Sequence, residues 1–258
     1  MAIHKKIGEV KQELQAAEET MLPFFIEAYR EDGRAGVQKL VQQAQKKLEA
    51  LRQERERVEA MKAYEKKYAS MAYICGIDEA GRGPLAGPVV AGAVILPKDC
   101  QILYLDDSKK LSEKRREQLY GVIMEQAVAV GVGIVEPERI DEINILQADY
   151  EAMRQAIQNL GVVPDILLND AVRIPQVAIP QVPIVHGDAK SISIAAASII
   201  AKVTRDRIMV CYDKEMPEYG FAKHKGYGTK EHRAAIEAHG LSPIHRRSFV
   251  KKLQDFRP

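Results

Sequence analysis

The chain of 258 residues is 46% hydrophobic and 29% charged, with a formal net charge of +2, a composition typical of a folded globular protein with a well-buried core. No window holds the roughly 18 uncharged apolar residues that a membrane span needs, and the N-terminus lacks the apolar segment of a secretory signal. The cysteines Cys75, Cys100 and Cys211 share no metal-ligand or disulfide spacing, so we expect a cytoplasmic protein with reduced, mostly buried thiols and no membrane partner.

Residues 1–70 differ from the rest of the chain because their apolar residues recur with helical spacing. One stripe consists of Ile3, Ile7, Val10, Leu14, Ala17 and Met21. A second stripe follows the break at Gly33 and Gly36 and consists of Val37, Val41, Ala44, Leu48, Leu51 and Val58. The two stripes predict an antiparallel helical hairpin, with a shorter linking helix over 23–31 in which Pro23 takes a tolerated early position.

From Met71 onward, β-rich runs alternate with helical patterns. We predict strands over 72–78, 89–96, 129–135, 165–169 and 182–185. We predict helices that begin at Ser112, at Glu142 or Asn144, at Ser191 and at Lys230. Three consecutive strands followed by alternating strands and helices predict a mixed sheet flanked by helices, so residues 71–258 are expected to form an α/β domain.

Acidic residues follow three of the predicted strands. Asp78 and Glu79 end the first strand, Asp170 ends the fourth, and Asp188 precedes the long helix. Adjacent side chains in a strand point to opposite faces, so we expect the first strand to end or bulge there, as the glycines of GRGPLAG would permit. Carboxylates that converge at the carboxyl ends of strands predict a site for a hard divalent cation, Mg²⁺ or Mn²⁺.

Each of these features has a simpler interpretation. Asp188 alone would be a helix N-cap, and Asp170 alone would be a surface turn residue. GRGPLAG does not have the spacing of a dinucleotide-binding loop, and the histidines of the last 35 residues lack a zinc pattern, which leaves phosphate contact or packing. The segment from Lys223 onward has nine basic residues against three acidic ones, which predicts either a phosphate-binding surface or a solvated face.

Five motifs together carry a family resemblance. They are GIDEAGRGPLAGPVVAGAVIL, DDSKKLS, LLND, HGDAKSISIAAASIIAKVTRD and HKGYGTKEHRAAIEAHGLSPIHRRSF. In this order, over about residues 72–250, the chain resembles bacterial ribonuclease HII. The resemblance implies a ribonuclease H-like fold with a mixed five-stranded sheet, plus an N-terminal helical extension. It also implies hydrolysis of the RNA strand in RNA–DNA hybrids and incision 5′ of ribonucleotides embedded in duplex DNA, leaving 3′-hydroxyl and 5′-phosphate ends, in ribonucleotide removal and primer processing.

The resemblance also assigns roles to individual residues. It implies that Asp78, Glu79, Asp170 and Asp188 are the catalytic acids and hold two divalent cations. It places the substrate-reading Gly-Arg-Gly element on Gly81, Arg82 and Gly83, and a junction-sensing tyrosine on Tyr227, which without the resemblance is equally well a core tyrosine. Lys109 and Lys190 take positions near the phosphate backbone. One departure is Ala171, where many relatives have glycine.

The expected partners are RNA–DNA hybrid and duplex DNA with embedded ribonucleotides, bound by a monomer; the sequence names no protein partner. Lysines of the N-terminal extension predict added substrate affinity, and dimerisation through its apolar stripe is the alternative. A nuclease of the same fold that cuts DNA alone and a non-catalytic hybrid-binding protein are the rival functions. The C-terminal KKLQDFRP is expected to be a frayed basic tail.

Overall fold

A computed structural model describes residues 5–254 of the chain, with the side chains of residues 5–251. The chain divides into two compact units, Met1–Glu59 and Ala60–Pro258. Within the described residues, no helix is long and apolar enough to cross a membrane.

The N-terminal unit consists of helices. Helix α1 spans Ile7–Ala16, α2 spans Leu22–Tyr29 and α3 spans Ala35–Met61, with a 3₁₀ turn over Glu19–Met21. The first predicted stripe is therefore not one helix, since the chain leaves α1 at Ala16 and α2 starts anew with Pro23 in its first turn. The buried side chains come from all three helices and include Val10, Leu22, Phe25, Val37, Val41 and Ala44. Ile3 lies outside the described residues.

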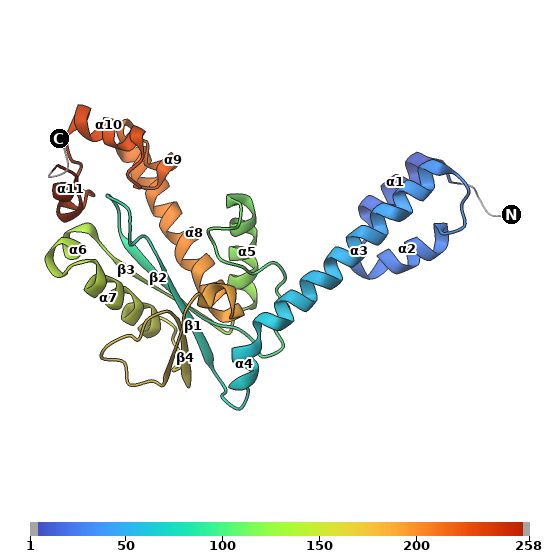
Figure 1. Ribbon diagram of the computed structural model, residues 1–258, viewed down its shortest axis with the longest axis horizontal. Coiled ribbons are helices and arrows are strands. Elements are labelled where there is room, and N and C mark those ends of the chain that lie inside the picture. Colours follow the sequence, from blue (N-terminus) through green and yellow to red (C-terminus); the bar gives the residue numbers. More distant parts are fainter. Residues whose placement is uncertain (1–4, 255–258) are drawn as a thin grey trace. The chain divides into compact units, whose positions relative to one another are not determined.

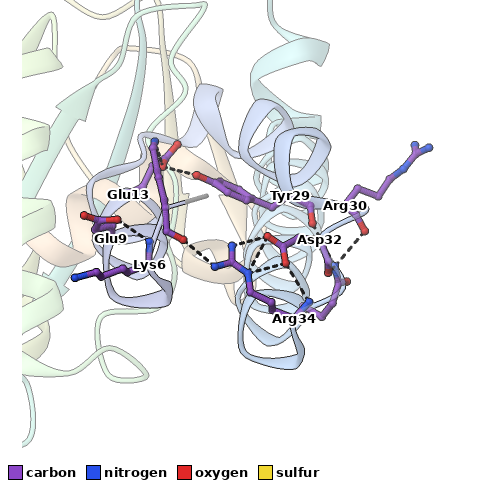
Figure 2. Close-up of polar contacts among 9 residues, drawn as sticks. Lys6, Glu9, Glu13, Tyr29, Arg30, Asp32 and Arg34 are labelled. Atoms are coloured by element: carbon purple, nitrogen blue, oxygen red, sulfur yellow. Dashed lines mark hydrogen bonds and ion pairs between the residues drawn. The ribbon is translucent and has the colours of Figure 1, made fainter. Parts of the chain in front are cut away.

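Polar contacts close the turn between α2 and α3 (Figure 2). The Arg34 guanidinium donates to the Asp32 carboxylate, at 2.6 Å for the shortest pair, and to the carbonyl of Lys5 at 2.8 Å. The Tyr29 hydroxyl donates to Glu13 of α1 at 2.7 Å. These contacts connect the start of α1 with the start of α3, and they are local to this unit.

The second unit is built on a five-stranded sheet with the order β3-β2-β1-β4-β5. The strands are β1 Ile74–Ala80, β2 Val89–Ile95, β3 Ala129–Val135, β4 Ile166–Asp170 and β5 Gln181–Ile184. Strands β1, β2 and β3 pair antiparallel as a meander, whereas β4 runs parallel to β1 and β5 parallel to β4. The predicted mixed sheet is confirmed, and each predicted strand lies within two residues of an observed one.

Two helices cover the two faces of this sheet (Figure 1). Helix α8, Ile192–Glu215, packs on β1 and β2, and α7, Ile145–Gln158, packs on the opposite face of the meander. Both helices lie very close to the strands. A Cβ at Gly76 would lie 2.0 Å from the Ser193 backbone, and one at Gly133 would lie 1.9 Å from the Ala152 carbonyl. The small residues are therefore required for the layers to pack.

The domain has further helices, none longer than α7. They are α4 Ala63–Lys67, α5 Glu113–Gln126, α6 Pro137–Ile143, α9 Phe221–His224, α10 Lys230–His239 and α11 Arg247–Gln254. Ser112, Asn144 and Ser191 cap α5, α7 and α8 through their side chains, as the sequence predicts. One prediction was wrong, because part of the expected frayed tail is helix α11. The prediction of mostly buried thiols is confirmed: Cys75 and Cys100 are buried, and Cys211 is exposed.

Candidate active site

The first two acids stand where the sheet loses a strand. Pairing between β1 and the parallel strand β4 ends at Ile77 and Asn169. On its other side, β1 continues beside β2 as far as Ala80 and Val90. The predicted end or bulge at Asp78 is therefore wrong, because β1 stays regular through both acids. It is β4 that stops, which leaves the edge of β1 open beside Asp78 and Glu79.

Asp78 and Glu79 point to opposite faces of the sheet, as strand geometry requires. Asp78 is 5% exposed and lies on the face covered by α8, close to Ser198. Its Oδ1 also accepts the backbone N–H of Glu79 at 2.8 Å. Glu79 lies on the α7 face, with Nη1 of Arg82 3.5 Å from its Oε1. One strand thus supplies an acid from each side of the sheet to the same edge.

Asp170 and Asp188 come from two segments that are bonded to each other. Asp170 is the last residue of β4, and its Oδ1 accepts the N–H of Gly187 at 2.7 Å. Asp188 follows in the 3₁₀ turn Gly187–Ala189 and is 9% exposed. The cap of α8 is Ser191, which accepts the N–H of Ile194, so the interpretation of Asp188 as an N-cap is wrong.

Ala171 follows Asp170 in a left-handed conformation, with a φ of 54°. Glycine adopts this conformation without the steric cost that alanine carries. The departure noted in the sequence therefore falls on a backbone position that favours glycine, directly after a site acid.

The site acids repel one another inside a poorly solvated edge. Burial, followed by the charges of Glu79 and Asp170, raises the pKa of Asp78 well above its usual value. Burial and Asp170 also raise the pKa of Glu79, although Arg82 opposes them. Burial, with Asp107 and Asp170, raises the pKa of Asp188. The four acids are therefore electrostatic neighbours that lack enough positive charge.

This excess of buried negative charge fits a divalent cation. Hard cations such as Mg²⁺ bind carboxylate oxygens, and their charge offsets the repulsion that raises these pKa values. Within the described residues, no group of three or more His, Cys, Asp or Glu side chains is already arranged to hold a metal ion. The residues fit such an ion by donor type, burial and charge rather than as a closed set of ligands.

Lys109 lies near this edge and Lys190 does not point into it. Partial burial lowers the pKa of Lys109, but nearby acids, of which Asp78 contributes most, raise it overall. The ammonium of Lys190 instead donates to the carbonyl of Val185 at 2.8 Å. Of the two lysines, it is Lys109 that the structure brings into the electrostatic field of the acids.

The Gly-Arg-Gly turn is held from inside the protein by a buried arginine. Arg246 is 0% exposed and donates to the carbonyls of Gly81 at 2.6 Å, Arg82 at 3.1 Å and Gly87 at 2.9 Å. Gly81 takes a φ of 98°, which side chains rarely allow. Burial, with the neighbouring Arg205 charge, lowers the pKa of Arg246 to about 9.

A second buried arginine joins this loop to the segment that carries Tyr227. Arg205 of α8 is also 0% exposed and donates to the carbonyls of Pro88, Ala86 and Lys225, at 2.9 to 3.0 Å. The Tyr227 ring lies beside the Gly-Arg-Gly turn, since a Cβ at Gly83 would be 4.0 Å from its Cε1. The ring is 41% exposed, so the interpretation of Tyr227 as a core tyrosine is wrong.

Two buried histidines fix the backbone of Tyr227 through an ordered chain of hydrogen bonds. Nδ1 of His232 donates to the Tyr227 carbonyl at 2.9 Å, and its Nε2 accepts from Nε2 of His245 at 3.0 Å. Nδ1 of His245 then accepts the N–H of Ser242 at 2.9 Å. Every ring nitrogen is satisfied only if both rings are neutral. Burial accordingly lowers the pKa of each histidine to about 4. These histidines pack inside the protein and hold the backbone of Tyr227. The packing interpretation offered by the sequence is therefore confirmed for His232 and His245.

A further contact ties the start of α8 to the short helix α4. Glu65 of α4 accepts the Ser191 hydroxyl at 2.6 Å and the N–H of Ser193 at 3.1 Å. An acid at this position satisfies free N–H groups and complements the helix dipole. Ser191 lies three residues after Asp188 in the chain. The α4 segment therefore helps to hold the part of the chain that carries this acid.

Several residues in or beside the site escaped the sequence analysis. They are Asp149, Ser198, Arg205, Arg246 and Glu65. Asp149 gave a signal that was overlooked, because it is an acid on the apolar face of α7 that carries Ala148, Ala152 and Met153. The arginines stand among ordinary basic residues, and their partners are carbonyls from distant segments, which no local pattern reveals.

Comparison with known proteins gives one consistent result. The family model for Ribonuclease HII matches residues 75–252, and the one for the Ribonuclease HII N-terminal domain matches residues 6–69. Among curated relatives, Ribonuclease HII of Lachnoclostridium phytofermentans is 60% identical, over 96% of this chain and 98% of the relative. That of Clostridioides difficile is 53% identical over the same shares. Among solved structures, ribonuclease H2 of Pyrococcus horikoshii matches with a TM-score of 0.58 and 28% identity, over 71% of this chain and 97% of that one.

Proposed function

The chain belongs to the ribonuclease HII family, whose members cleave the RNA of RNA–DNA hybrids, and on that premise we propose how its own residues perform and restrict this reaction. We propose that Asp78, Glu79, Asp170 and Asp188 are the catalytic acids, and that duplex DNA with an embedded ribonucleotide is a substrate incised on the 5′ side. The observation that carries the proposal is the set of buried and partly buried carboxylates where β4 leaves the edge of β1 open.

The proposed cofactor is a pair of divalent cations, Mg²⁺ or Mn²⁺, held by these four acids. Such a pair, when bound, activates a water for attack on the phosphodiester and stabilises the leaving oxygen, giving 3′-hydroxyl and 5′-phosphate ends. Lys109 adds a positive charge beside the acids, where it attracts the phosphate backbone.

We propose that the Gly-Arg-Gly turn recognises the ribonucleotide. Gly81 and Gly83 have no side chains, so their backbone groups can reach a 2′-hydroxyl, which both donates and accepts hydrogen bonds. Arg82 is positioned to pair with a neighbouring phosphate. Because Arg246 holds two carbonyls of this turn, the recognition groups are fixed before the substrate arrives.

Tyr227 is the proposed sensor of the ribonucleotide–deoxyribonucleotide junction. Its ring lies next to Gly83 and is partly exposed, so it can pack against the sugar that follows the ribonucleotide. Its backbone carbonyl is bound by His232, and Arg205 donates to the carbonyl of Lys225, two residues before it. Ring and turn are thus kept in register by the same buried framework, which supports one recognition surface.

The proposed division of labour places catalysis in residues 71–258 and added substrate affinity in residues 1–70. Residues 6–69 match a family model of their own, which supports a distinct N-terminal module. The site that we propose in the second unit draws its acids, glycines and tyrosine from residues 78–227.

The test is cleavage of an end-labelled DNA duplex that carries one ribonucleotide, with an all-DNA duplex of the same sequence as the control. We expect a single incision 5′ of the ribonucleotide with Mg²⁺ or Mn²⁺, none with chelator, and none in the all-DNA duplex. Cutting of both duplexes would show that the 2′-hydroxyl is not read. Cleavage of a long hybrid without incision at the single ribonucleotide would restrict the enzyme to hybrids and overturn the proposed role of Tyr227.

A further inference from the structure

Asp149 of α7 is a buried acid that the proposed reaction does not use. It is 0% exposed, and neither of its carboxylate oxygens has a hydrogen-bond partner among the residues that the structure describes. Native proteins leave few buried polar groups unpaired, because each one costs stability. An unpaired buried carboxyl therefore calls for a functional explanation.

The charged groups near Asp149 belong to the proposed substrate-binding turn. Its Oδ2 lies 3.6 Å from Nε of Arg82, which is ion-pair distance without a hydrogen bond. Glu79 approaches the same guanidinium from the strand, 3.5 Å from Nη1. Burial, followed by repulsion from Glu79, raises the pKa of Asp149 to about 8, and Arg82 opposes the rise. Arg82 thus lies between an acid of β1 and an acid of α7.

We propose that Asp149 is a positioning residue that directs the Arg82 side chain toward the phosphate backbone of the substrate. The proposal rests on the proposed role of Arg82 in binding. The Arg82 side chain is 45% exposed, and an arginine so exposed adopts many rotamers unless a fixed partner limits them.

Glu79 alone is a poor partner for this purpose. As a proposed cation ligand, it shares its charge with the cations, so its hold on Arg82 weakens in the loaded enzyme. Asp149 is on another element, α7, and is buried like its helix neighbours Ala148, Ala152 and Met153, so its position is set by the core. It is the acid that remains available to Arg82 throughout the reaction.

The proposal predicts opposite effects on stability and on binding. Asp149→Asn removes a buried ionisable group and should raise the melting temperature, since the carboxyl has no hydrogen bonds to lose. The same change should raise KM for the duplex with one ribonucleotide roughly threefold to tenfold, with kcat within about twofold. A residue with only a structural role would lower stability and activity together. Asp149→Leu, which also removes polarity, should act in the same direction.

The experiment is a double-mutant cycle of Asp149→Asn with Arg82→Ala, read by KM, kcat and melting temperature on that duplex with Mg²⁺. We expect the double variant to have the KM of Arg82→Ala alone, because Asp149 acts through Arg82. Glu151→Gln is the matched control, since Glu151 lies on the same helix and pairs with Arg139 at 3.2 Å. It should leave KM unchanged.

The outcomes separate this inference from the proposed function. If Arg82→Ala itself leaves KM unchanged, the proposed binding role of Arg82 is wrong. If Arg82→Ala raises KM but Asp149→Asn does not, or if the two effects multiply in the double variant, Asp149 does not act through Arg82. A fall in both melting temperature and kcat for Asp149→Asn and Asp149→Leu would assign it a structural role instead.

Discussion

Two regions of the same domain differ in how their buried charges are compensated. One is the acid edge of β1, with the proposed catalytic acids; the other consists of the recognition segments beside it, the Gly81–Gly83 turn and the segment around Tyr227. Asp78 and Asp188 are buried and Glu79 is partly buried, with too little positive charge around them, and their pKa values are raised as a result. In the recognition segments, Arg205 and Arg246 are also buried, but each donates to three carbonyls. One region carries unsatisfied charge, and the other is saturated with hydrogen bonds.

The difference follows from what each region has to bind. A cation site gains its affinity from negative charge that the free protein leaves uncompensated. A surface that reads a 2′-hydroxyl must hold backbone groups and a ring within a fraction of an ångström, so its own hydrogen bonds have to be complete. The edge of β1 therefore keeps negative charge that is not compensated, whereas buried arginines hold the neighbouring segments rigid.

The largest expected effect comes from Asp78→Asn, which removes one charge from the acid edge. We expect kcat to fall by about a thousandfold or more, because several kcal/mol of cation-assisted stabilisation are lost. Binding of the duplex should change little. The melting temperature without divalent cation should rise, since the buried repulsion is relieved. Single-turnover cleavage and thermal unfolding measure the two effects.

The control for that prediction is Asp99→Asn, an exposed acid outside the site, which should change neither quantity. Added Mg²⁺ should stabilise the unmodified chain by mass action and stabilise Asp78→Asn much less. Equal stabilisation of both proteins by Mg²⁺ would contradict the assignment of Asp78 as a ligand.

The second prediction concerns Arg246, one of the two buried arginines of the recognition segments. Arg246→Met leaves the carbonyls of Gly81, Arg82 and Gly87 without their donor, and we expect about 3 kcal/mol of lost stability. We also expect kcat/KM on the single-ribonucleotide duplex to fall by roughly 30-fold, because the turn is no longer held. Urea unfolding and steady-state kinetics provide the measurements. Arg247→Met, at the next and exposed position, should be close to neutral.

The third prediction concerns the dependence of stability on pH. Lowering the pH should destabilise the recognition segments, whereas raising it should destabilise the acid edge. The pKa of about 4 for His232 and His245 lies below the usual value near 6.5, so their neutral forms stabilise the fold above pH 6.5. That stability, about 3 kcal/mol for each histidine, is lost as pH falls from 6.5 toward 4. The acids have raised pKa values, so they destabilise the fold as pH rises.

Thermal unfolding between pH 4 and pH 8 tests this difference. His245→Gln should flatten the acidic side of the profile and leave the alkaline side unchanged. His239→Gln, at an exposed histidine of the same segment, should leave the whole profile unchanged. An acidic limb that persists in His245→Gln would show that the histidine chain does not set it.

The smallest expected effect comes from removing the N-terminal unit, which belongs to neither of the two regions. Deleting residues 1–59 should raise KM for the hybrid roughly threefold, with kcat unchanged, if the extension adds only backbone contacts. Deleting residues 1–69 should in addition lower kcat and stability, because it removes Glu65 and its bonds to Ser191 and Ser193. A changed molecular mass with unchanged KM after the shorter deletion would favour dimerisation instead.

Local patterns in the sequence were enough for much of the fold. Alternation of apolar residues gave the strands, and Ser112, Asn144 and Ser191 gave the helix starts, because a cap side chain bonds the first free N–H groups of its own helix. Helix α6 and the short α9 were missed, since few residues define them. The roles of the site acids are a proposal; the structure shows Asp78 and Glu79 near the end of β1, Asp170 at the end of β4 and Asp188 in the turn before α8.

By itself, the sequence determined the element types, the mixed sheet and, through its motifs, the family, because these depend on residue periodicity and order along the chain. Only the tertiary structure decided that β4 stops beside Asp78 while β1 continues, and that Arg246 holds the Gly-Arg-Gly turn across 165 positions. It also placed Asp149, whose carboxylate has no hydrogen bond, at ion-pair distance from Arg82. These contacts join segments that are remote in sequence, and their energies depend on burial and on hydrogen-bond partners, which exist only once the chain has packed.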